Sequence, residues 1–283
     1  MECTLSLQCD DQPGLVALVA GYLAGRGGNI LDAQQFNDRL SGRFFMRVVF
    51  ALPAGDSAEA WRDHFGELAA AHGMQWRLRV NSERQRVVLM VSRFDHCLAD
   101  LLYRWRIGEI DMEVAAILSN HPESALTTNL TGQDIPFYHL PITKATKPAQ
   151  EAEIKRIVTE VGADLVVLAR YMQILSDDLA AFLSGRCINI HHSFLPGFKG
   201  AKPYHQAHER GVKMIGATAH YVTADLDEGP IIAQEVGIIS HADEPEDLVR
   251  KGRDIERRVL AAAVQAHLED RVFLNGQRTV VFS

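Results

Sequence analysis

Residues 187–235 read CINIHHSFLPGFKGAKPYHQAHERGVKMIGATAHYVTADLDEGPIIAQE, and this stretch decides how the second half of the chain is interpreted. Its first five residues alternate, so a strand is predicted with Asn189 and His191 on the same face. The loop at 193–200 contains Pro196 and two glycines, which end the strand directly after this pair. The pair therefore lies at the carboxyl end of a strand, where open α/β sheets bind ligands.

A second apolar run, residues 214–223, contains His220 and leads into an acidic turn at 225–230 before a strand at 231–236. This turn carries Asp227 towards His191. An amide can bind an oxyanion, an imidazole can move protons, and a carboxylate can orient that imidazole. The order Asn189, His191, His220, Asp227 therefore predicts an active site for chemistry at a carbonyl group, with water as the nucleophile.

Three other interpretations compete with this one. Ser193 lies close to His191, but no Gly-x-Ser-x-Gly elbow accompanies it, which disfavours a Ser-His-Asp triad. In a second alternative, Asn189 caps a turn and the histidines are hydrogen-bonded polar groups near a core, without a catalytic role. The sequence HQAHE at 205–209 has the wrong spacing for a metalloprotease helix, so no metal is expected.

Composition limits the class of protein. The 283 residues are 47% hydrophobic and 23% charged, with a formal net charge of -7, which disfavours a nucleic-acid partner. No apolar run reaches the length of a membrane helix, and no basic segment precedes an apolar one near the N-terminus. The four cysteines have no Cys-x-x-Cys spacing. We therefore expect a cytoplasmic protein without a membrane partner, a disulfide framework or a structural zinc site.

The periodicity of the first 80 residues predicts the order βαββαβ. The expected strands are 4–9, 29–37, 43–52 and 75–80, and the expected helices start at Leu15 and span 57–72. The polar stretch NSERQR at 81–86 is the predicted linker. This gives a domain at 1–80 with a ferredoxin-like order of elements and a second domain at 87–283.

The second domain alternates buried strands with helices. Strands are expected at 87–91, 112–118, 136–140 and 164–169, and helices after residue 96, at 147–161 and at 244–267. A hairpin around Asn275-Gly276 is expected at 272–282. The alternation is typical of a doubly wound, mostly parallel, Rossmann-like α/β sheet.

Several motifs resemble a known family. Asn189-Ile-His191, the run SFLP at 193–196, FKG at 198–200, and His220 followed by DEGP at 227–230 resemble the folate-dependent formyltransferases. The resemblance covers residues 87 to about 275. The doubled His191-His192 before SFLP is similar to the formyltetrahydrofolate deformylases in particular, since glycinamide ribonucleotide formyltransferases have proline after the histidine.

This resemblance implies an activity and roles for residues. It implies hydrolysis of 10-formyltetrahydrofolate to tetrahydrofolate and formate, with Asn189 stabilising the oxyanion, His191 relaying a proton, Asp227 orienting His191, and His220 positioning water. No cofactor other than this folate substrate is implied. Two loops align with those that hold the pterin: Arg170, Tyr171, Met172, Ile174 and Leu175 in one, and Ala224 and Asp225 in the other. The alternatives are formyl transfer to an amine, and an amino-acid sensor without catalysis.

The first domain resembles the ACT domain, a module that commonly binds amino acids. The resemblance rests on DQPG at 11–14 before the first helix and on GNI at 28–30 after it. It implies an effector site at Gly14 and Asn29, with glycine or methionine as the effector by family analogy. The alternative is a domain used only for subunit pairing, and we expect a homo-oligomer, a dimer or a tetramer.

The loop SRFDH at 92–96 bears on the choice between water and an amine acceptor. In the glycinamide ribonucleotide formyltransferases the corresponding loop is rich in glycine and binds the phosphate of the acceptor. Here Phe94 is bulky and Asp95 repels a phosphate, although Arg93 and the helix dipole attract one. The loop therefore predicts a closed acceptor site.

Overall fold

The computed structural model describes residues 1–130, 134–197 and 203–283, and the described chain divides into two compact units. The first unit comprises residues 1–84, 269–275 and 279–283, and the second comprises 85–268 and 276–278. The sequence FKG at 198–200, part of the predicted loop after Asn189 and His191, lies outside the described residues.

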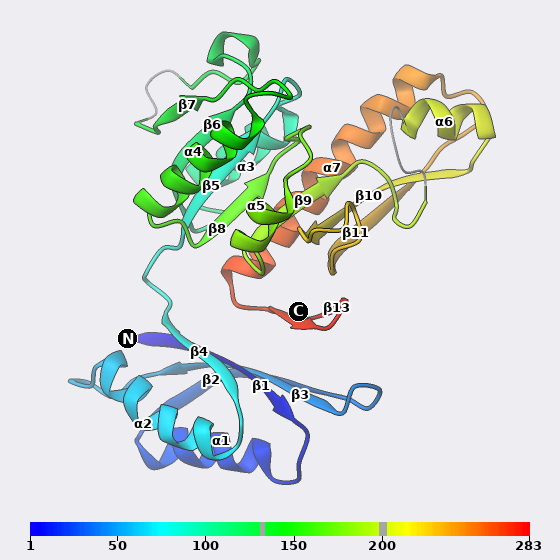
Figure 1. Ribbon diagram of the computed structural model, residues 1–283. Helices are drawn as coiled ribbons and strands as arrows, with labels where there is room; N and C mark the ends of the chain where they lie inside the picture. Colours follow the sequence, from blue (N-terminus) through cyan, green and yellow to red (C-terminus); the bar gives the residue numbers. More distant parts are fainter. Residues whose placement is uncertain (131–133, 198–202) are drawn as a thin grey trace. The chain divides into compact units, whose positions relative to one another are not determined.

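The first unit has the predicted order of elements (Figure 1). These are β1 (Glu2–Asp10), α1 (Leu15–Gly25), β2 (Asn29–Asp38), β3 (Arg43–Ala51), α2 (Ala58–Ala71) and β4 (Gln75–Val80). The strands form an antiparallel sheet in the order β2-β3-β1-β4. The predicted βαββαβ fold is therefore confirmed.

Strand β3 carries large apolar side chains on both of its faces, although Arg43 and Arg47 share the second face with Phe45. Phe44 and Phe50 point to the side covered by the helices, where they join a core that includes Trp61 of α2. Phe45 points to the opposite side, as the two-residue period of a strand requires, and packs there with Phe273 and Phe282. The second face of this sheet therefore needs a cover of its own.

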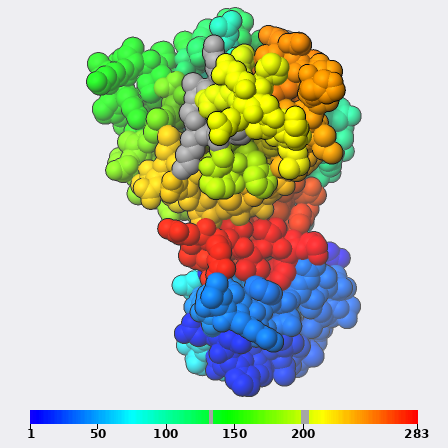
Figure 2. Space-filling model, turned by 90° about the vertical axis from the view of Figure 1, so that its right-hand side faces the viewer, coloured from blue at the N-terminus to red at the C-terminus, as the bar shows by residue number. Residues whose placement is uncertain are grey.

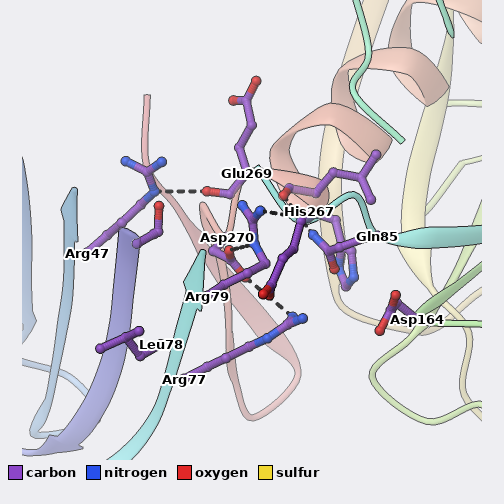
Figure 3. A network of polar contacts seen from close by, with 12 residues as sticks. Arg47, Arg77, Leu78, Arg79, Gln85, Asp164, His267, Glu269 and Asp270 are labelled. Carbon is purple, nitrogen blue, oxygen red and sulfur yellow. Dashed lines mark hydrogen bonds and ion pairs between the residues drawn. The ribbon is translucent and has the colours of Figure 1, made fainter. Parts of the chain in front are cut away.

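The C-terminal segment provides that cover. Its two short strands, β12 (Val272–Asn275) and β13 (Arg278–Val281), pair with each other. Arg47 Nε donates to the carbonyl oxygen of Glu269 at 2.9 Å, and Arg79 Nε donates to Asp270 Oδ2 at 2.7 Å (Figure 3). The space-filling view shows the red C-terminal residues in contact with blue residues of the first unit (Figure 2).

The predicted domain boundaries therefore differ from this division at the C-terminus. A boundary at 87–283 places the whole tail in the second domain, whereas most of residues 269–283 belong to the first unit. The hairpin itself has the predicted position. The pattern of the tail predicts that it forms a hairpin, but only the three-dimensional packing of Phe273 and Phe282 on Phe45 determines which unit it joins.

The second unit alternates strands and helices as predicted. Its elements are β5 (Arg86–Val91), α3 (His96–Arg106), β6 (Glu113–Ser119), the 3₁₀ turn η1 (Glu123–Ala125), β7 (Phe137–His139), α4 (Lys147–Glu160), β8 (Leu165–Leu168), α5 (Asp177–Phe182), β9 (Cys187–His191), α6 (Pro203–Arg210), β10 (Met214–Tyr221), β11 (Ile231–Ile238) and α7 (Pro245–Leu268). The short helices α5 and α6 are additions to the predicted elements.

The sheet of this unit has the order β11-β10-β9-β8-β5-β6-β7. Strands β5 to β9 are parallel, and β10 and β11 run antiparallel. The predicted doubly wound, mostly parallel sheet is confirmed. The chain moves outward from β5 to β7 and then returns to β8, so the topological switch point lies between β5 and β8.

Helices cover both faces of the sheet (Figure 1). Strand β5 is buried along its length because its continuous apolar run, residues 87–91, packs on both sides. Helices α4 and α5 share a core with one face, and α7 packs against α3, β9, β10 and β11. No helix within the described ranges is long and apolar enough to cross a membrane.

Candidate active site

A cavity of about 320 Å³ opens at the carboxyl ends of β8 and β9. Its wall consists of the loop after β8, the end of β9, part of β10 and the acidic turn that follows β10. The lining residues are Leu168, Arg170, Tyr171, Met172, Gln173, Ile174, Leu175, Asn189, Ile190, His191, His192, His220, Val222, Thr223, Ala224, Asp225, Leu226 and Asp227. Every residue predicted from the sequence as catalytic or substrate-binding is among them.

The strands set the relative positions of the polar side chains. Asn189 and His191 are two residues apart on β9 and line the same cavity, as the alternation predicts. Strand β10 runs antiparallel to β9 and places His220 directly opposite Asn189. The turn after β10 then brings Asp227 back to this edge. The four predicted polar residues therefore meet although 38 positions separate the first from the last.

His191 and Asp227 form a buried hydrogen-bonded pair. Nδ1 of His191 lies 3.2 Å from Oδ2 of Asp227, and both side chains are largely shielded from solvent. Burial alone would raise the pKa of the Asp227 carboxyl, but the hydrogen bond from His191, with a smaller contribution from the nearby His220 ring, outweighs burial and holds that pKa well below its ordinary value. Asp227 is therefore a carboxylate at every physiological pH.

The other nitrogen of His191 is free. Nε2 is buried and has no hydrogen-bond partner within the part of the chain that the structure describes. A buried polar atom without a partner is uncommon in a folded protein. His191 lines the cavity, and Nε2 is the nitrogen of its ring that no described group engages.

The tautomer of His220 follows from its two contacts. Nδ1 lies 2.9 Å from the carbonyl oxygen of Tyr221, which can only accept, so Nδ1 carries a proton. In the neutral ring, Nε2 then accepts from the Asn189 amide nitrogen at 3.2 Å. Asp227 Oδ1, at 3.7 Å from Nε2, is too far for a good hydrogen bond. His220 thereby fixes the Asn189 amide, whose second N–H stays available to a ligand.

The turn after β10 depends on a glycine that the sequence analysis did not single out. A Cβ on Gly229 would lie 1.7 Å from the carbonyl oxygen of Tyr221 and 3.2 Å from Nδ1 of His220. Asp227 itself adopts a left-handed backbone with φ 57, which aspartate tolerates better than most residues. The Gly229-Pro230 pair indicates a turn in the sequence, whereas the close approach that requires glycine follows only from the structure.

The loop after β8 is fixed through its backbone. The amide of Ser92 donates to the carbonyl oxygen of Arg170 at 3.2 Å, and the amide of Met172 donates to Ser92 Oγ at 2.9 Å. Arg170 has a left-handed φ of 67, which costs about 1 to 2 kcal/mol for a residue with a Cβ. The lining residues that the sequence analysis missed are Leu168, Gln173, Ile190, His192, Val222, Thr223 and Leu226.

His192 is the most informative of the missed residues. Burial, followed by the charge of Arg170, lowers the pKa of its imidazole to about 4. The ring centroids of His191 and His192 are 5.3 Å apart. His192 is therefore neutral at physiological pH and adds no positive charge beside His191. The doubled histidine in the sequence was used for the family resemblance and not as a sign of a lining residue.

Two alternatives from the sequence can be compared with the geometry. The Ser193 hydroxyl donates to the carbonyl oxygen of Gly197 at 2.8 Å, so its proton is not directed at His191, which disfavours a Ser-His-Asp triad. Among the described side chains, the group with metal-ligand spacing is His96, Cys97 and Glu256, not the histidines of α6.

The predicted effector residues lie in the first unit. Gly14 precedes α1 with φ 93, a conformation that glycine adopts without strain, and its carbonyl accepts from the Leu18 amide at 2.8 Å. Asn29 is exposed at the first position of β2. Both lie at the predicted turn positions, and their role in binding stays a prediction.

Comparison with known proteins places the chain in a family. A family model described as "Formyl transferase" matches residues 85–264, and one described as "ACT domain" matches residues 4–66. The formyltetrahydrofolate deformylase of Corynebacterium sp. (strain P-1) is 52% identical over 281 residues, which cover 98% of this chain and 96% of the relative. The chain belongs to the formyltetrahydrofolate deformylase family. The resemblance predicted from the motifs around Asn189 and Asp227 is thereby confirmed.

Other members of the deformylase family also match along nearly the whole chain. The relative from Escherichia coli (strain K12) is 40% identical over 274 residues, covering 96% of this chain and 95% of the relative. A crystal structure of the formyltetrahydrofolate deformylase from Pseudomonas putida KT2440 is 50% identical, covers 100% of both chains and has a TM-score of 0.94. By contrast, glycinamide ribonucleotide transformylase 1 from Symbiobacterium toebii is 30% identical, covers 73% of this chain and 97% of its own, and has a TM-score of 0.65.

Proposed function

We propose that this protein hydrolyses 10-formyltetrahydrofolate to tetrahydrofolate and formate at the cavity lined by Asn189, His191 and Asp227. Family membership supports the substrate and the reaction. The observation that carries the assignment of the site is the buried Nε2 of His191, which has no partner among the described residues, while the other nitrogen of the ring is paired with Asp227. Such a nitrogen can exchange a proton with a bound substrate.

The arrangement can stabilise attack on a formyl carbon. The Asn189 N–H that His220 leaves free donates to the developing oxyanion, which lowers the barrier most when the donor is already oriented. Water attacks the carbonyl carbon and loses a proton to the His191–Asp227 pair. His191 Nε2 then protonates the departing folate nitrogen, the carbon–nitrogen bond breaks, and formate leaves.

The loops at 170–175 and 224–227 are proposed to hold the pterin. Leu168, Ile174, Leu175, Val222 and Leu226 give this part of the cavity apolar walls, and the adjoining backbone supplies polar groups. Arg170, Tyr171, Met172, Ala224 and Asp225 complete the proposed contacts. This assignment rests on the family's loops and on the shape of the cavity.

The loop between β5 and α3 supports water rather than a phosphorylated amine as the acceptor. Asp95 is 4% exposed and accepts from Thr127 Oγ1 at 2.7 Å and from the Thr128 amide at 2.6 Å. Burial would raise the pKa of Asp95, but these hydrogen bonds outweigh it and lower that pKa, so the group is a carboxylate. A fixed negative charge at the start of α3 opposes phosphate binding there.

The test is to measure formate and all folate products with purified protein, with and without glycinamide ribonucleotide. We expect formate release with no acceptor, no change when the amine is added, and no formylated amine by mass spectrometry. Stoichiometric formyl transfer would overturn the assignment in favour of a transferase. No turnover of the formyl-folate under either condition would favour the non-catalytic sensor.

A regulatory role for the first unit is the second part of the proposal. The match to the ACT domain supports an amino-acid effector, with Gly14 and Asn29 as its contacts and glycine or methionine as the first candidates. An effector must bind two states of the enzyme with different affinity to change its activity. The alternative use of this unit in a homo-oligomer, a dimer or a tetramer, is distinguished by whether any amino acid binds.

A further inference from the structure

The crevice at the topological switch point, between the ends of β5 and β8, is closed by the protein's own groups. Ligands of doubly wound sheets enter at this position. Here the loops that follow the two strands are joined directly, since the Ser92 amide donates to the Arg170 carbonyl and Ser92 Oγ accepts from the Met172 amide. The hydroxyl of Ser92 donates in turn to Asn120 Oδ1 at 2.7 Å. The polar groups that could have bound a second substrate are therefore hydrogen-bonded to other groups of the protein.

Glu256 of α7 holds the side chains at this crevice together. It is 1% exposed, and its Oε2 lies 2.8 Å from His96 Nε2 and 3.3 Å from Arg170 Nε. Its Oε1 accepts from the Tyr204 hydroxyl at 2.6 Å. Burial would raise the pKa of Glu256, but the hydrogen bond from His96 and the charge of Arg170 outweigh it and lower that pKa. One carboxylate thus ties α3, α6 and the loop after β8 to α7.

This cluster has the ligand atoms of a metal site but not its charge balance. The ligand atoms of His96, Cys97 and Glu256 lie within 4.8 Å of one another. Both oxygens of Glu256 are already hydrogen-bonded or paired, and burial raises the pKa of Cys97 well above its ordinary value, so Cys97 is a neutral thiol. The guanidinium of Arg170 provides the positive charge that the carboxylate needs, and it would repel a cation.

Arg170 connects the cluster to the proposed site of reaction. It lines the same cavity as His191 and His192, and only 10% of its side chain is exposed. Its guanidinium is planar and always charged, its Nε lies 3.3 Å from Glu256 Oε2, and burial and its charge together lower the pKa of the lining residue His192, which places the guanidinium in the wall at the switch-point end of the cavity. A water molecule can pass beside such a wall, whereas a larger nucleophile needs the volume that the guanidinium fills.

We propose that Arg170, fixed by Glu256, is a specificity-determining residue that makes water the acceptor of the formyl group and excludes amines. The proposal rests on the proposed hydrolysis. If the wall is removed, an amine can reach the formyl carbon, and its nitrogen forms the new carbon–nitrogen bond. The bond to the folate nitrogen breaks, that nitrogen takes a proton, and the attacking amine loses one, so the products are tetrahydrofolate and a formylated amine.

Arg170→Gly tests this directly. Glycine adopts the φ of 67 without strain, so the substitution removes the guanidinium and keeps the backbone that lines the cavity. The variant is incubated with 10-formyltetrahydrofolate and glycinamide, and formate and N-formylglycinamide are counted by mass spectrometry. We expect the ratio of formylated amine to formate to rise at least about tenfold over the wild type. A tenfold change is about the lower end of the discrimination between substrates that the shape of a pocket achieves.

Two further variants make the result decisive. The double variant Arg170→Gly, Glu256→Gln removes both charges of the ion pair. It replaces the single variant in the same product measurement if the single variant does not fold. Asp270→Gly is the matched control, because Asp270 is also left-handed, with φ 54, and is paired with arginine in the first unit. Its product ratio should equal that of the wild type. A purely structural role for Arg170 would lower total turnover without changing the ratio, and that result would overturn the proposal. Absence of formate release by the wild type would instead count against the proposed hydrolysis.

Discussion

Nδ1 of His191 lies 3.2 Å from Oδ2 of Asp227, while Nε2 of the same ring is buried without a partner among the described residues. The two nitrogens therefore have different tasks. Nδ1 is committed to a carboxylate that stays charged, and Nε2 belongs to a ring that lines the cavity and is engaged by no described group. A carboxylate fixed in this way orients the ring and stabilises its protonated form, which a proton relay requires.

Asp227→Asn should lower kcat by roughly two orders of magnitude or more and leave the affinity for the folate similar. The change keeps the shape of the side chain but removes the charge that sustains His191. Steady-state formate release and direct folate binding measure the two effects. Glu228→Gln, an exposed neighbour outside the cavity lining, is the control and should retain normal turnover. Near-normal turnover of Asp227→Asn would remove this carboxylate from the mechanism.

His192 should make the protein less stable in mild acid. Its pKa is lowered from 6.5 to about 4 in the folded state, so the unfolded chain binds an additional proton between these values. The free energy of unfolding should therefore fall as the pH drops from about 6.5 to 4, by at most about 1.4 kcal/mol per pH unit, with no effect above that window. Urea unfolding at pH 7.5 and pH 5 measures this. His192→Gln should lose less stability between the two conditions than the wild type, and an equal loss would contradict the assignment.

An amino-acid effector should bind the first unit with measurable heat. Calorimetry across the common amino acids, beginning with glycine and methionine, should find a ligand that also shifts formate release, consistent with a coupling free energy of roughly 1 to 3 kcal/mol. Asn29→Ala removes an exposed side chain at the start of β2 and should weaken binding without changing stability. Gln35→Ala, which removes another exposed side chain of the same strand, is the control. If no amino acid binds, only the role in assembly remains for this unit.

Phe273→Ala should loosen the C-terminal segment from the first unit. Phe273 is 7% exposed and packs edge-to-face on Phe45 and Phe282, so its loss should cost about 3 kcal/mol. Hydrogen exchange should show faster exchange in β12, β13 and the facing part of β3. Leu274→Ala is the matched control, because the neighbouring Leu274 is 39% exposed and its truncation should cost under about 0.5 kcal/mol. Equal effects of the two substitutions would mean that the tail is not held by this packing.

Much of the fold is determined locally, and the sequence alone was enough to predict it. The alternation of residues 187–191 placed Asn189 and His191 on one face of a strand, and the turn chemistry of 225–230 placed Asp227 in a loop. Continuous apolar runs such as 87–91 predicted strands buried on both faces, and the structure confirms them. These signals depend on the period of a strand or on the φ preferences of glycine and proline, which act over a few residues.

Only the tertiary structure decided the contacts between residues that lie far apart in the chain. It alone placed Glu256 beside Arg170 and His96, left Nε2 of His191 without a partner among the described residues, and put the tail on Phe45. None of these contacts follows from a local pattern, because the packing of whole elements specifies a buried ion pair or an aromatic contact. In the sequence, Glu256 looks like one more charged residue on a solvated helix. The sequence determined which groups the chain carries to the edge of the sheet, and the packing of α7 and the loops decided which of them remain free to react.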